Sequence, residues 1–233
     1  MTQLDQTGGD RVIYRCLLGL TVVTGVVDAV SFLRLGHIFT ANMTGNVVFL
    51  GFALAGETEI SAARSSTALA SFACGGFLGG RISAKVGAST QSLLIAMTIE
   101  TALLLCSAAG ASLERSHSST ALVYPVLVLM AIAMGVRNAV VRRLGVRDLT
   151  TTVLTMTITG LAADSQLGGG RGDRSRARML PILMMGAGAF GGALVLRAFG
   201  LAAALAAAAV FVAALAMYVI ARRRTQADIE PAS

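Results

Sequence analysis

Apolar residues gather in eight runs along the chain, separated by short polar or glycine-containing stretches. The runs begin near Cys16, Ile38, Ser65, Ser92, Thr120, Leu149, Met179 and Gly200. Four of them are near the roughly 20 residues with which an α-helix crosses a bilayer: Cys16 to Leu35, Thr120 to Val141, Met179 to Leu196 and Gly200 to Ala221. The pattern therefore predicts an all-α polytopic membrane protein with a single membrane domain over residues 1–233.

The two halves of the chain resemble each other in the order and spacing of their polar and glycine residues. The offset between matching positions drifts only from 109 to 113 residues. The matching pairs are Gly25-x-x-Asp28-Ala29 with Gly135-x-x-Asn138-Ala139, Leu35-Gly36 with Leu144-Gly145, Thr40 with Thr150, Thr44-x-Asn46 with Thr155-x-Thr157, Gly75-x-Phe77-x-Gly79 with Gly188-x-Phe190-x-Gly192, and Gly87 with Gly200. We therefore predict an internal two-fold repeat of about residues 11–112 and 120–224. In transporters, such a repeat typically places a binding site at its interface.

The positions of the basic residues favour six crossings over eight. If all eight runs cross, 8 basic residues lie outside and 11 inside. If the runs from Ile38 and Leu149 only dip into the membrane and return, Arg34, Arg64, Arg115 and Arg197 alone lie outside, and 15 of the 19 basic residues lie inside. The positive-inside rule favours the second arrangement, with both termini cytoplasmic and the two repeats inverted. Eight crossings is the alternative.

The composition agrees with a membrane location and narrows the function classes. Hydrophobic residues make up 55% of the chain and charged residues 13%, against about 25% charged in soluble domains. The net charge is +7, but the basic residues lie between the apolar runs and form no basic face for nucleic acid. The three cysteines lie in apolar runs without a CxxC pair, and the two histidines are about eighty positions apart. We therefore expect no metal site, no cofactor and no nucleic-acid partner.

Asp28 lies in the middle of the first apolar run. An ionisable group at this depth costs roughly 2.5–3.5 kcal/mol on insertion scales, so it should face a cavity or a partner. One interpretation is an ion, proton or substrate site that also includes Asn138, the repeat equivalent of Asp28. The other is a structural ion pair with Arg137 or Arg34. Glu100 is a second candidate intramembrane carboxylate, unless it lies near a helix end.

Amide and hydroxyl side chains cluster in the two short polar runs. Their neutral donors and acceptors suit a cation or a small polar solute, and the alternative is hydrogen bonding between helices. We expect them to share one polar centre with Asp28 and Arg137. The candidates are Asn42, Thr44 and Asn46 in the first half and Thr151, Thr152 and Thr155 in the second.

Glycines recur at four-residue spacing in the third and seventh runs. Gly75 and Gly79, Gly76 and Gly80, and Gly188 and Gly192 form such pairs, a spacing that lets membrane helices approach closely. We expect them to serve mainly helix packing, and homo-oligomerisation through these faces is left open. No nucleophile, base or motif for an intramembrane enzyme can be named.

Two stretches resemble the motifs of a known family. The first is Asp28-Ala29-x-Ser31-Phe32-Leu33-x-Leu35-Gly36-x-x-Phe39-Thr40-Ala41-Asn42-Met43-Thr44-Gly45-Asn46, which is similar to the signature of the YoaK family of uncharacterised bacterial membrane proteins. The second runs from Arg137-Asn138-Ala139 through Arg143-Leu144-Gly145 to Asp148-Leu149-Thr150-Thr151-Thr152. The resemblance covers nearly the whole chain. Met156 departs from it, because Gly is expected there by analogy with Gly45. The resemblance implies a multi-pass protein of the bacterial inner membrane and no particular activity.

Three functions are therefore carried forward. The first is a small transporter or channel for a polar solute or ion, which the repeat, the buried carboxylate and the paired polar runs favour. The second is a membrane assembly or regulatory subunit that does not transport. The third is an intramembrane enzyme acting on lipid.

Overall fold

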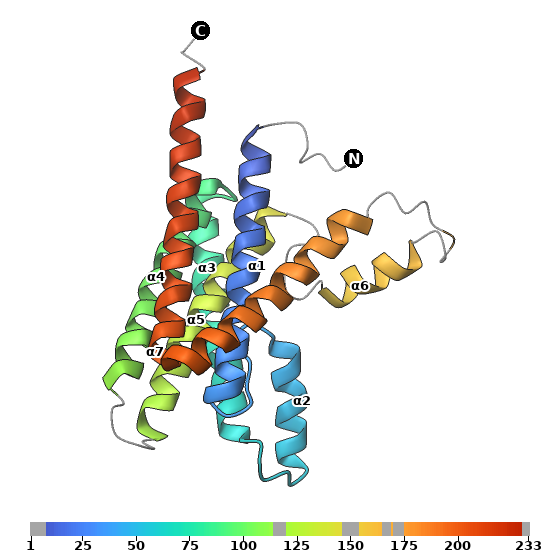
Figure 1. The fold of residues 1–233 in the computed structure, drawn as a ribbon, viewed down its shortest axis with the longest axis vertical. Helices are drawn as coiled ribbons and strands as arrows, with labels where there is room; N and C mark the ends of the chain where they lie inside the picture. Colours follow the sequence, from blue (N-terminus) through green and yellow to red (C-terminus); the bar gives the residue numbers. More distant parts are fainter. Residues whose placement is uncertain (1–7, 114–119, 146–153, 165–168, 170–174, 230–233) are drawn as a thin grey trace.

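The computed structural model describes residues 8–113, 120–145, 154–164, 169 and 175–229, and all regular structure in these residues is α-helical (Figure 1). The helices are α1 Gly8–Arg34, α2 Met43–Leu54, α3 Ala62–Val86, α4 Thr90–Leu113, α5 Thr120–Leu144, α6 Leu154–Ala163 and α7 Ser175–Ile229. The predicted helical membrane protein is thus confirmed at the level of fold class.

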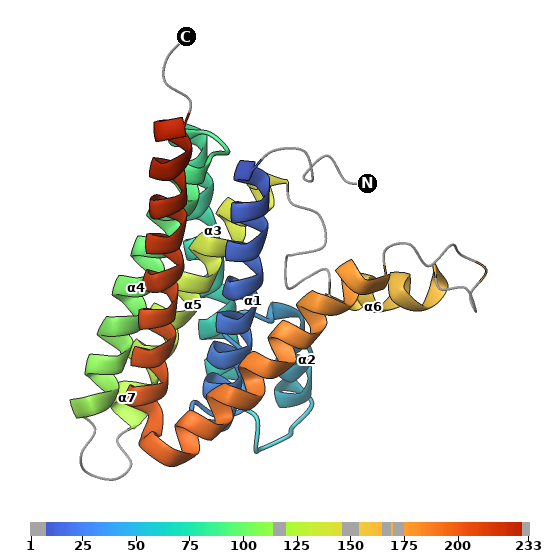
Figure 2. The same ribbon diagram turned by 45° about the horizontal axis from the view of Figure 1, so that its top comes forward.

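Four helices are long and apolar enough to cross a membrane: Arg11–Arg34, Thr90–Leu113, Leu122–Leu144 and Met179–Thr225. The last of these belongs to α7, whose 55 residues turn sharply at Gly200, where φ is 84° and ψ is −179°. The two arms of α7 therefore run in different directions, which is plain in Figure 2. Helix α3 has 25 residues, which is also long enough to cross a bilayer.

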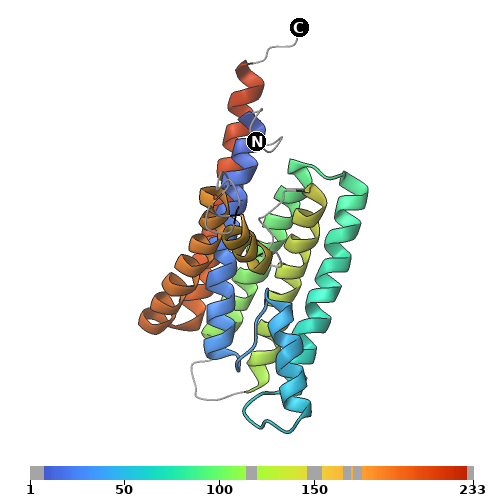
Figure 3. The same ribbon diagram turned by 90° about the vertical axis from the view of Figure 1, so that its right-hand side faces the viewer.

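The second and sixth apolar runs form short helices. Helix α2 has 12 residues and α6 has 10, which correspond to about 18 and 15 Å at 1.5 Å per residue. Both lengths are below the roughly 30 Å hydrocarbon core. Helix α2 packs against α3, and α6 packs against α7. In Figures 1 and 3, α2 lies beside the lower part of the bundle.

Helices α3 and α5 approach closely through glycines. The buried face of α3 consists entirely of small residues: Ser65, Ala68, Ser71, Gly75, Gly79 and Ser83. A Cβ on Gly75 would collide with the backbone of Ile132, and a Cβ on Gly79 with the backbone of Val136. On the opposing helix, a Cβ on Gly135 would collide with the carbonyl oxygen of Phe72. The spacing therefore serves helix packing within one chain, as the glycine pattern predicts.

Helices α1 and α7 approach in the same way. A Cβ on Gly188 would collide with the backbone of Val22, and a Cβ on Gly192 would lie 2.8 Å from the Cα of Val26. On α1, a Cβ on Gly25 would collide with the carbonyl oxygen of Met185. By contrast, Gly76, Gly80 and Gly191 have open space where a Cβ would stand.

The core lies where α4 and α5 meet α1 and the second arm of α7. Its largest fully buried apolar side chains include Met97, Leu127, Met130, Met134 and Leu205. Helix α4 packs on both α5 and α7. Most of the large exposed side chains lie on the outer faces, among them Phe77, Phe190, Phe199 and Val210. An apolar exterior around a packed interior is what a lipid environment requires of a helical bundle.

Candidate functional site

Four polar side chains form a buried stripe along α1. Thr21, Thr24, Asp28 and Ser31 are each at most 7% exposed. Their spacing of three, four and three residues places them on one face of the helix. The hydroxyls of Thr21 and Thr24 donate to the carbonyl oxygens of Leu17 and Leu20, each at 3.0 Å. The stripe connects two polar clusters, one around Asp28 and one around Arg137.

Asp28 holds the segment that leads from α1 into α2. The chain reverses after α1 at Gly36 and His37, whose φ angles of 97° and 57° are left-handed. Asp28 Oδ1 then accepts hydrogen bonds from the backbone amides of Thr40 at 3.0 Å and Ala41 at 2.8 Å. These amides precede the N-terminus of α2, where a negative charge is favoured by the helix dipole. The carboxylate therefore anchors the start of the short helix.

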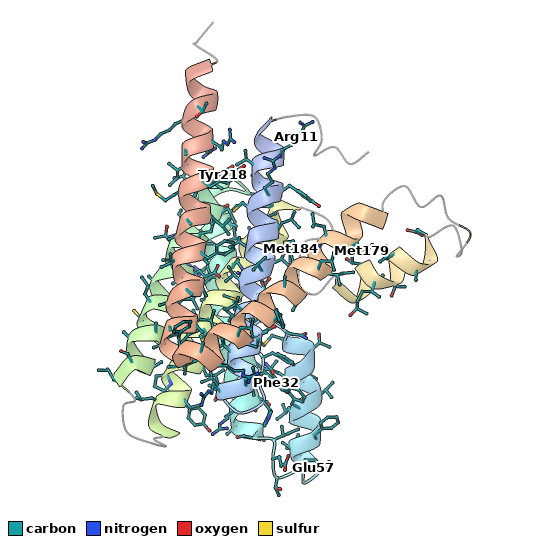
Figure 4. The ribbon with its side chains drawn as sticks, viewed as in Figure 1. Arg11, Phe32, Glu57, Met179, Met184 and Tyr218 are labelled. Carbon is teal, nitrogen blue, oxygen red and sulfur yellow. The ribbon has the colours of Figure 1, made fainter. Side chains whose placement is uncertain are left out.

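Asn46 fixes the same segment from the other side. Its Oδ1 accepts from the backbone amide of Phe39 at 2.9 Å, and its Nδ2 donates to the carbonyl oxygen of Phe39 at 2.6 Å. The ring of Phe39 stacks on Phe32 and on Phe49, at centroid distances of 5.2 and 5.7 Å. Figure 4 shows Phe32 near the C-terminal end of α1. Asp28 and Asn46 thus shape the connection between α1 and α2.

Arg137 forms a buried ion pair with Glu100. Arg137 Nη1 lies 2.7 Å from Glu100 Oε1, and the two side chains are 3% and 0% exposed. The guanidinium also donates to the carbonyl oxygen of Leu20 at 3.3 Å and to Thr24 Oγ1 at 2.5 Å. Helices α1, α4 and α5 therefore meet at one charged centre. Glu100 Oε2 has no hydrogen-bond partner among the described residues.

A small cavity adjoins this centre between α1 and α5. It has a volume of about 20 Å³ and is lined by Leu17, Leu20, Thr21, Thr24, Arg137, Asn138 and Val141. This volume holds about one water-sized occupant. Arg137 is the one charged side chain in the lining. The cavity therefore joins a cation, an amide and two hydroxyls within the membrane-spanning part of the bundle.

The predicted site residues are divided between these clusters and the surface. Asp28 and Asn46 belong to the α1–α2 connection, and Arg137 and Asn138 line the cavity. The candidates Asn42, Thr44 and Thr155 are exposed. Thr151 and Thr152 lie outside the described residues.

The expected ion pair between Asp28 and Arg137 differs from what the structure shows. Asp28 bonds to backbone amides, and Arg137 takes Glu100 as its partner. Arg137 still interacts electrostatically with Asp28 over a longer distance. The sequence analysis named Glu100 as a candidate intramembrane carboxylate but did not identify Arg137 as its partner. It also did not include Thr21 and Thr24 among the site residues. The polar spacing along α1 could have revealed the two threonines.

Metal ligation finds no support in the described part of the chain. No three His, Cys, Asp or Glu side chains lie close enough there to hold a metal ion. Cys16 is buried, with its thiol 3.8 Å from the sulfur of Met97, while Cys74 and Cys106 are exposed.

Fold and centre together define a multi-pass helical membrane protein with a charged pair buried among its helices. The chain belongs to the family described as "Protein of unknown function (DUF1275)", whose sequence pattern matches residues 16–218. It is 35% identical over 151 residues to the UPF0700 transmembrane protein YoaK of Bacillus subtilis (strain 168). That alignment covers 64% of this chain and 65% of the relative, just under two thirds of its length. No solved structure matches the chain. The resemblance to the YoaK family is thus confirmed.

Proposed function

We propose that the chain crosses the bacterial inner membrane six times, through α1, α3, α4, α5 and the two arms of α7. Helices α2 and α6 then enter and return as re-entrant segments. Their lengths of 12 and 10 residues support this count, as does the placing of 15 of the 19 basic residues on one side. Arg11 and Glu57 lie at opposite ends of the bundle (Figure 4). Both termini are cytoplasmic in this topology.

The two halves form an inverted repeat. Gly75 meets Ile132 and Gly188 meets Val22, while Gly79 meets Val136 and Gly192 meets Val26. The two sets of contacts correspond residue by residue, because Val22 and Val26 lie 110 positions before Ile132 and Val136. The helices that carry them run in opposite directions: α1 against α5, and α3 against the first arm of α7 (Figure 1). This reciprocal contact supports a two-fold axis in the membrane plane.

The backbone supports the same repeat at two turns. Gly87 has φ 84° and ψ 168° where α3 ends, and its equivalent Gly200 has φ 84° and ψ −179° within α7. Gly36 and its equivalent Gly145 both have positive φ, 97° and 68°. Each follows a long helix of its half, α1 or α5. Matching left-handed glycines at matching positions are expected of duplicated units, because few other residues adopt this conformation.

The protein is a small transporter or channel for a polar solute or ion. The observation that carries this proposal is the buried centre of Arg137, Glu100 and Thr24, which adjoins the cavity between α1 and α5. A charged pair inside the membrane is expensive to bury, and such groups commonly mark solute or ion pathways. The repeat supports the same location, because the centre joins α1 of one half to α5 of the other.

Within this centre, each group has a distinct role. Arg137 and the Asn138 amide offer donors to a solute in the cavity. Glu100 neutralises Arg137 when the cavity holds no charged occupant. Thr24 orients the guanidinium by accepting its N–H. Asp28 lies outside the cavity lining and fixes the re-entrant segment at α2.

Flux through the purified protein tests the proposal. Proteoliposomes are shrunk by a hyperosmotic shift with one salt or small polar solute at a time, and light scattering follows re-swelling. Re-swelling reports that the added solute enters. We expect the protein to accelerate re-swelling for at least one solute in the panel, relative to empty liposomes.

Two matched threonine variants connect the flux to the centre. The hydroxyls of Thr24 and Thr98 both donate to the backbone carbonyl oxygen four residues earlier. Thr24→Val also removes the acceptor of Arg137, whereas Thr98→Val removes only an exposed hydroxyl. We expect Thr24→Val to slow entry at least several-fold and Thr98→Val to leave it unchanged. Equal rates of solute entry in the two variants would show that the centre is not part of the pathway. No flux for any solute or ion would favour a membrane subunit that does not transport.

A further inference from the structure

We propose that the cavity at Arg137 takes one halide-sized monovalent anion together with one proton on Glu100. This inference rests on the proposed transport function and specifies its substrate class. It starts from the lining of the cavity. Arg137 is the one charged lining group, and Asn138 adds an amide donor. A cation in this cavity would meet the guanidinium, so the charge of the site selects an anion.

The size of the cavity narrows the class of anion. A volume of about 20 Å³ accommodates one water-sized occupant. A monatomic halide is of this size, so chloride is the simplest anion with which the site can be probed. Arg137 already lines the cavity, so a bound ion and the Glu100 pair share this one side chain.

Charge balance requires that a proton enter the site together with the anion. Arg137 and Glu100 form a neutral pair at 2.7 Å. An anion that binds Arg137 would give the pair and its anion one net negative charge in a medium that solvates charge poorly. If a hydronium ion from the adjoining aqueous phase gives its proton to the Glu100 carboxylate, one O–H bond of the hydronium breaks and one forms on Glu100. The carboxyl group is then neutral, water is released, and the anion becomes the counter-ion of Arg137. One proton and one anion then enter together, with no change in net charge.

The surroundings of Glu100 make it the group that accepts this proton. Arg137 faces it from α5, and the Cys16 thiol lies within electrostatic range from α1. Asp28, also on α1, interacts with Arg137 but is already held by the amides of Thr40 and Ala41. The buried face of the second arm of α7 supplies only Ala, Leu and Val side chains, and that of α3 only Ser, Ala and Gly. Glu100 Oε2 has no hydrogen-bond partner among the described residues, so it can carry the proton.

Chloride binding to the detergent-purified full chain tests the linkage. Chloride replaces gluconate at constant ionic strength, and thermal stabilisation gives an apparent Kd at pH 5.5, 6.5 and 7.5. One linked proton predicts that the Kd rises about tenfold per pH unit wherever Glu100 is ionised. In Glu100→Gln, we expect chloride to bind with the same Kd at all three pH values. A pH-independent Kd in the unchanged protein, or an unaltered slope in Glu100→Gln, would overturn the coupling.

A double variant guards against misfolding. Glu100→Gln alone leaves Arg137 without its counter-ion, which can unfold the protein. Glu100→Gln with Arg137→Met removes both charges of the pair together, so neither partner is left buried without the other. We expect this double variant to fold and to lose chloride stabilisation. Retained stabilisation there would show that chloride binds elsewhere.

Flux separates this inference from the proposed function. Proteoliposomes loaded with the pH dye pyranine receive an inward chloride gradient. Coupled entry acidifies the interior at a rate that does not change when the membrane potential is clamped with valinomycin. Flux of another polar solute without chloride binding would refute the anion site and retain the transporter. Chloride binding with the predicted pH slope but no flux of any ion or solute would retain the site and refute transport.

Discussion

Replacing Gly75 by alanine tests the helix contacts on which the whole arrangement depends. The new Cβ would collide with the carbonyl oxygen, carbonyl carbon and Cα of Ile132. These are backbone atoms of α5, so the clash is relieved only if one helix moves. Overpacking of this kind typically costs about 1–3 kcal/mol. Gly188→Ala meets the same three backbone atoms of Val22 on α1, so the repeat predicts a loss of similar size.

The neighbouring glycines provide matched controls. Gly76 and Gly191 lie on the same two helices, with nothing within 4 Å of an added Cβ. Alanine there should be neutral or stabilise the helix by up to about 1 kcal/mol. Thermal unfolding in detergent can be followed with a thiol-reactive dye after the exposed Cys74 and Cys106 have been replaced. The remaining thiol, Cys16, is 0% exposed and reacts only when the protein unfolds. At ~2–4 °C per kcal/mol, Gly75→Ala and Gly188→Ala should each lower Tm by several degrees. Equal Tm values for Gly75→Ala and Gly76→Ala would refute the reasoning.

Three further outcomes are expected. Asp28→Asn weakens two charge-assisted hydrogen bonds from the amides of Thr40 and Ala41, so the free energy of unfolding should fall by roughly 1–2 kcal/mol. Solute entry should be retained, and loss of entry at unchanged stability would place Asp28 in the pathway. Asn46→Ala removes both hydrogen bonds to the backbone of Phe39 and should lower the free energy of unfolding in chemical denaturation by roughly 1–3 kcal/mol. Replacing the exposed Thr44 by alanine should lower it little, and equal losses in the two variants would contradict the role of Asn46. In a cysteine-free background, a membrane-impermeant maleimide should label Glu57→Cys but not Thr225→Cys in intact cells, and the reverse pattern would invert the proposed topology.

The fold class could be read from the sequence because lipid imposes simple rules on length and composition. The runs beginning near Cys16, Thr120 and Gly200 all correspond to long helices or helix arms. The glycine spacing also predicted close packing, since four-residue spacing places small residues on one helix face. The runs beginning near Met179 and Gly200 correspond to the two arms of α7, which meet at the non-helical Gly200.

The site was predicted less well because charge partners depend on which helices become neighbours. Periodicity places Arg137 and Asp28 at a known depth on their helices, but it does not say which carboxylate faces Arg137. Helix α4 packs directly on α5, so Glu100 becomes the partner. Asp28 accepts hydrogen bonds from backbone amides twelve and thirteen residues away. Every residue except proline has such an amide, so the identities of Thr40 and Ala41 do not reveal them as the partners of Asp28.

The pairing of α1 with α7 sets an order for biosynthesis. Gly25 is translated 163 residues before its contact Gly188, so at about 5–20 residues per second the first helix waits on the order of ten seconds or more for its partner. Helices α3 and α5 complete their contact much earlier. Throughout that interval the glycine face of α1 is open to lipid or to the insertion machinery. A ribosome that stalls before α7 would therefore leave a nascent chain in which α1 can meet α5 at Arg137 but its glycine face has no partner helix.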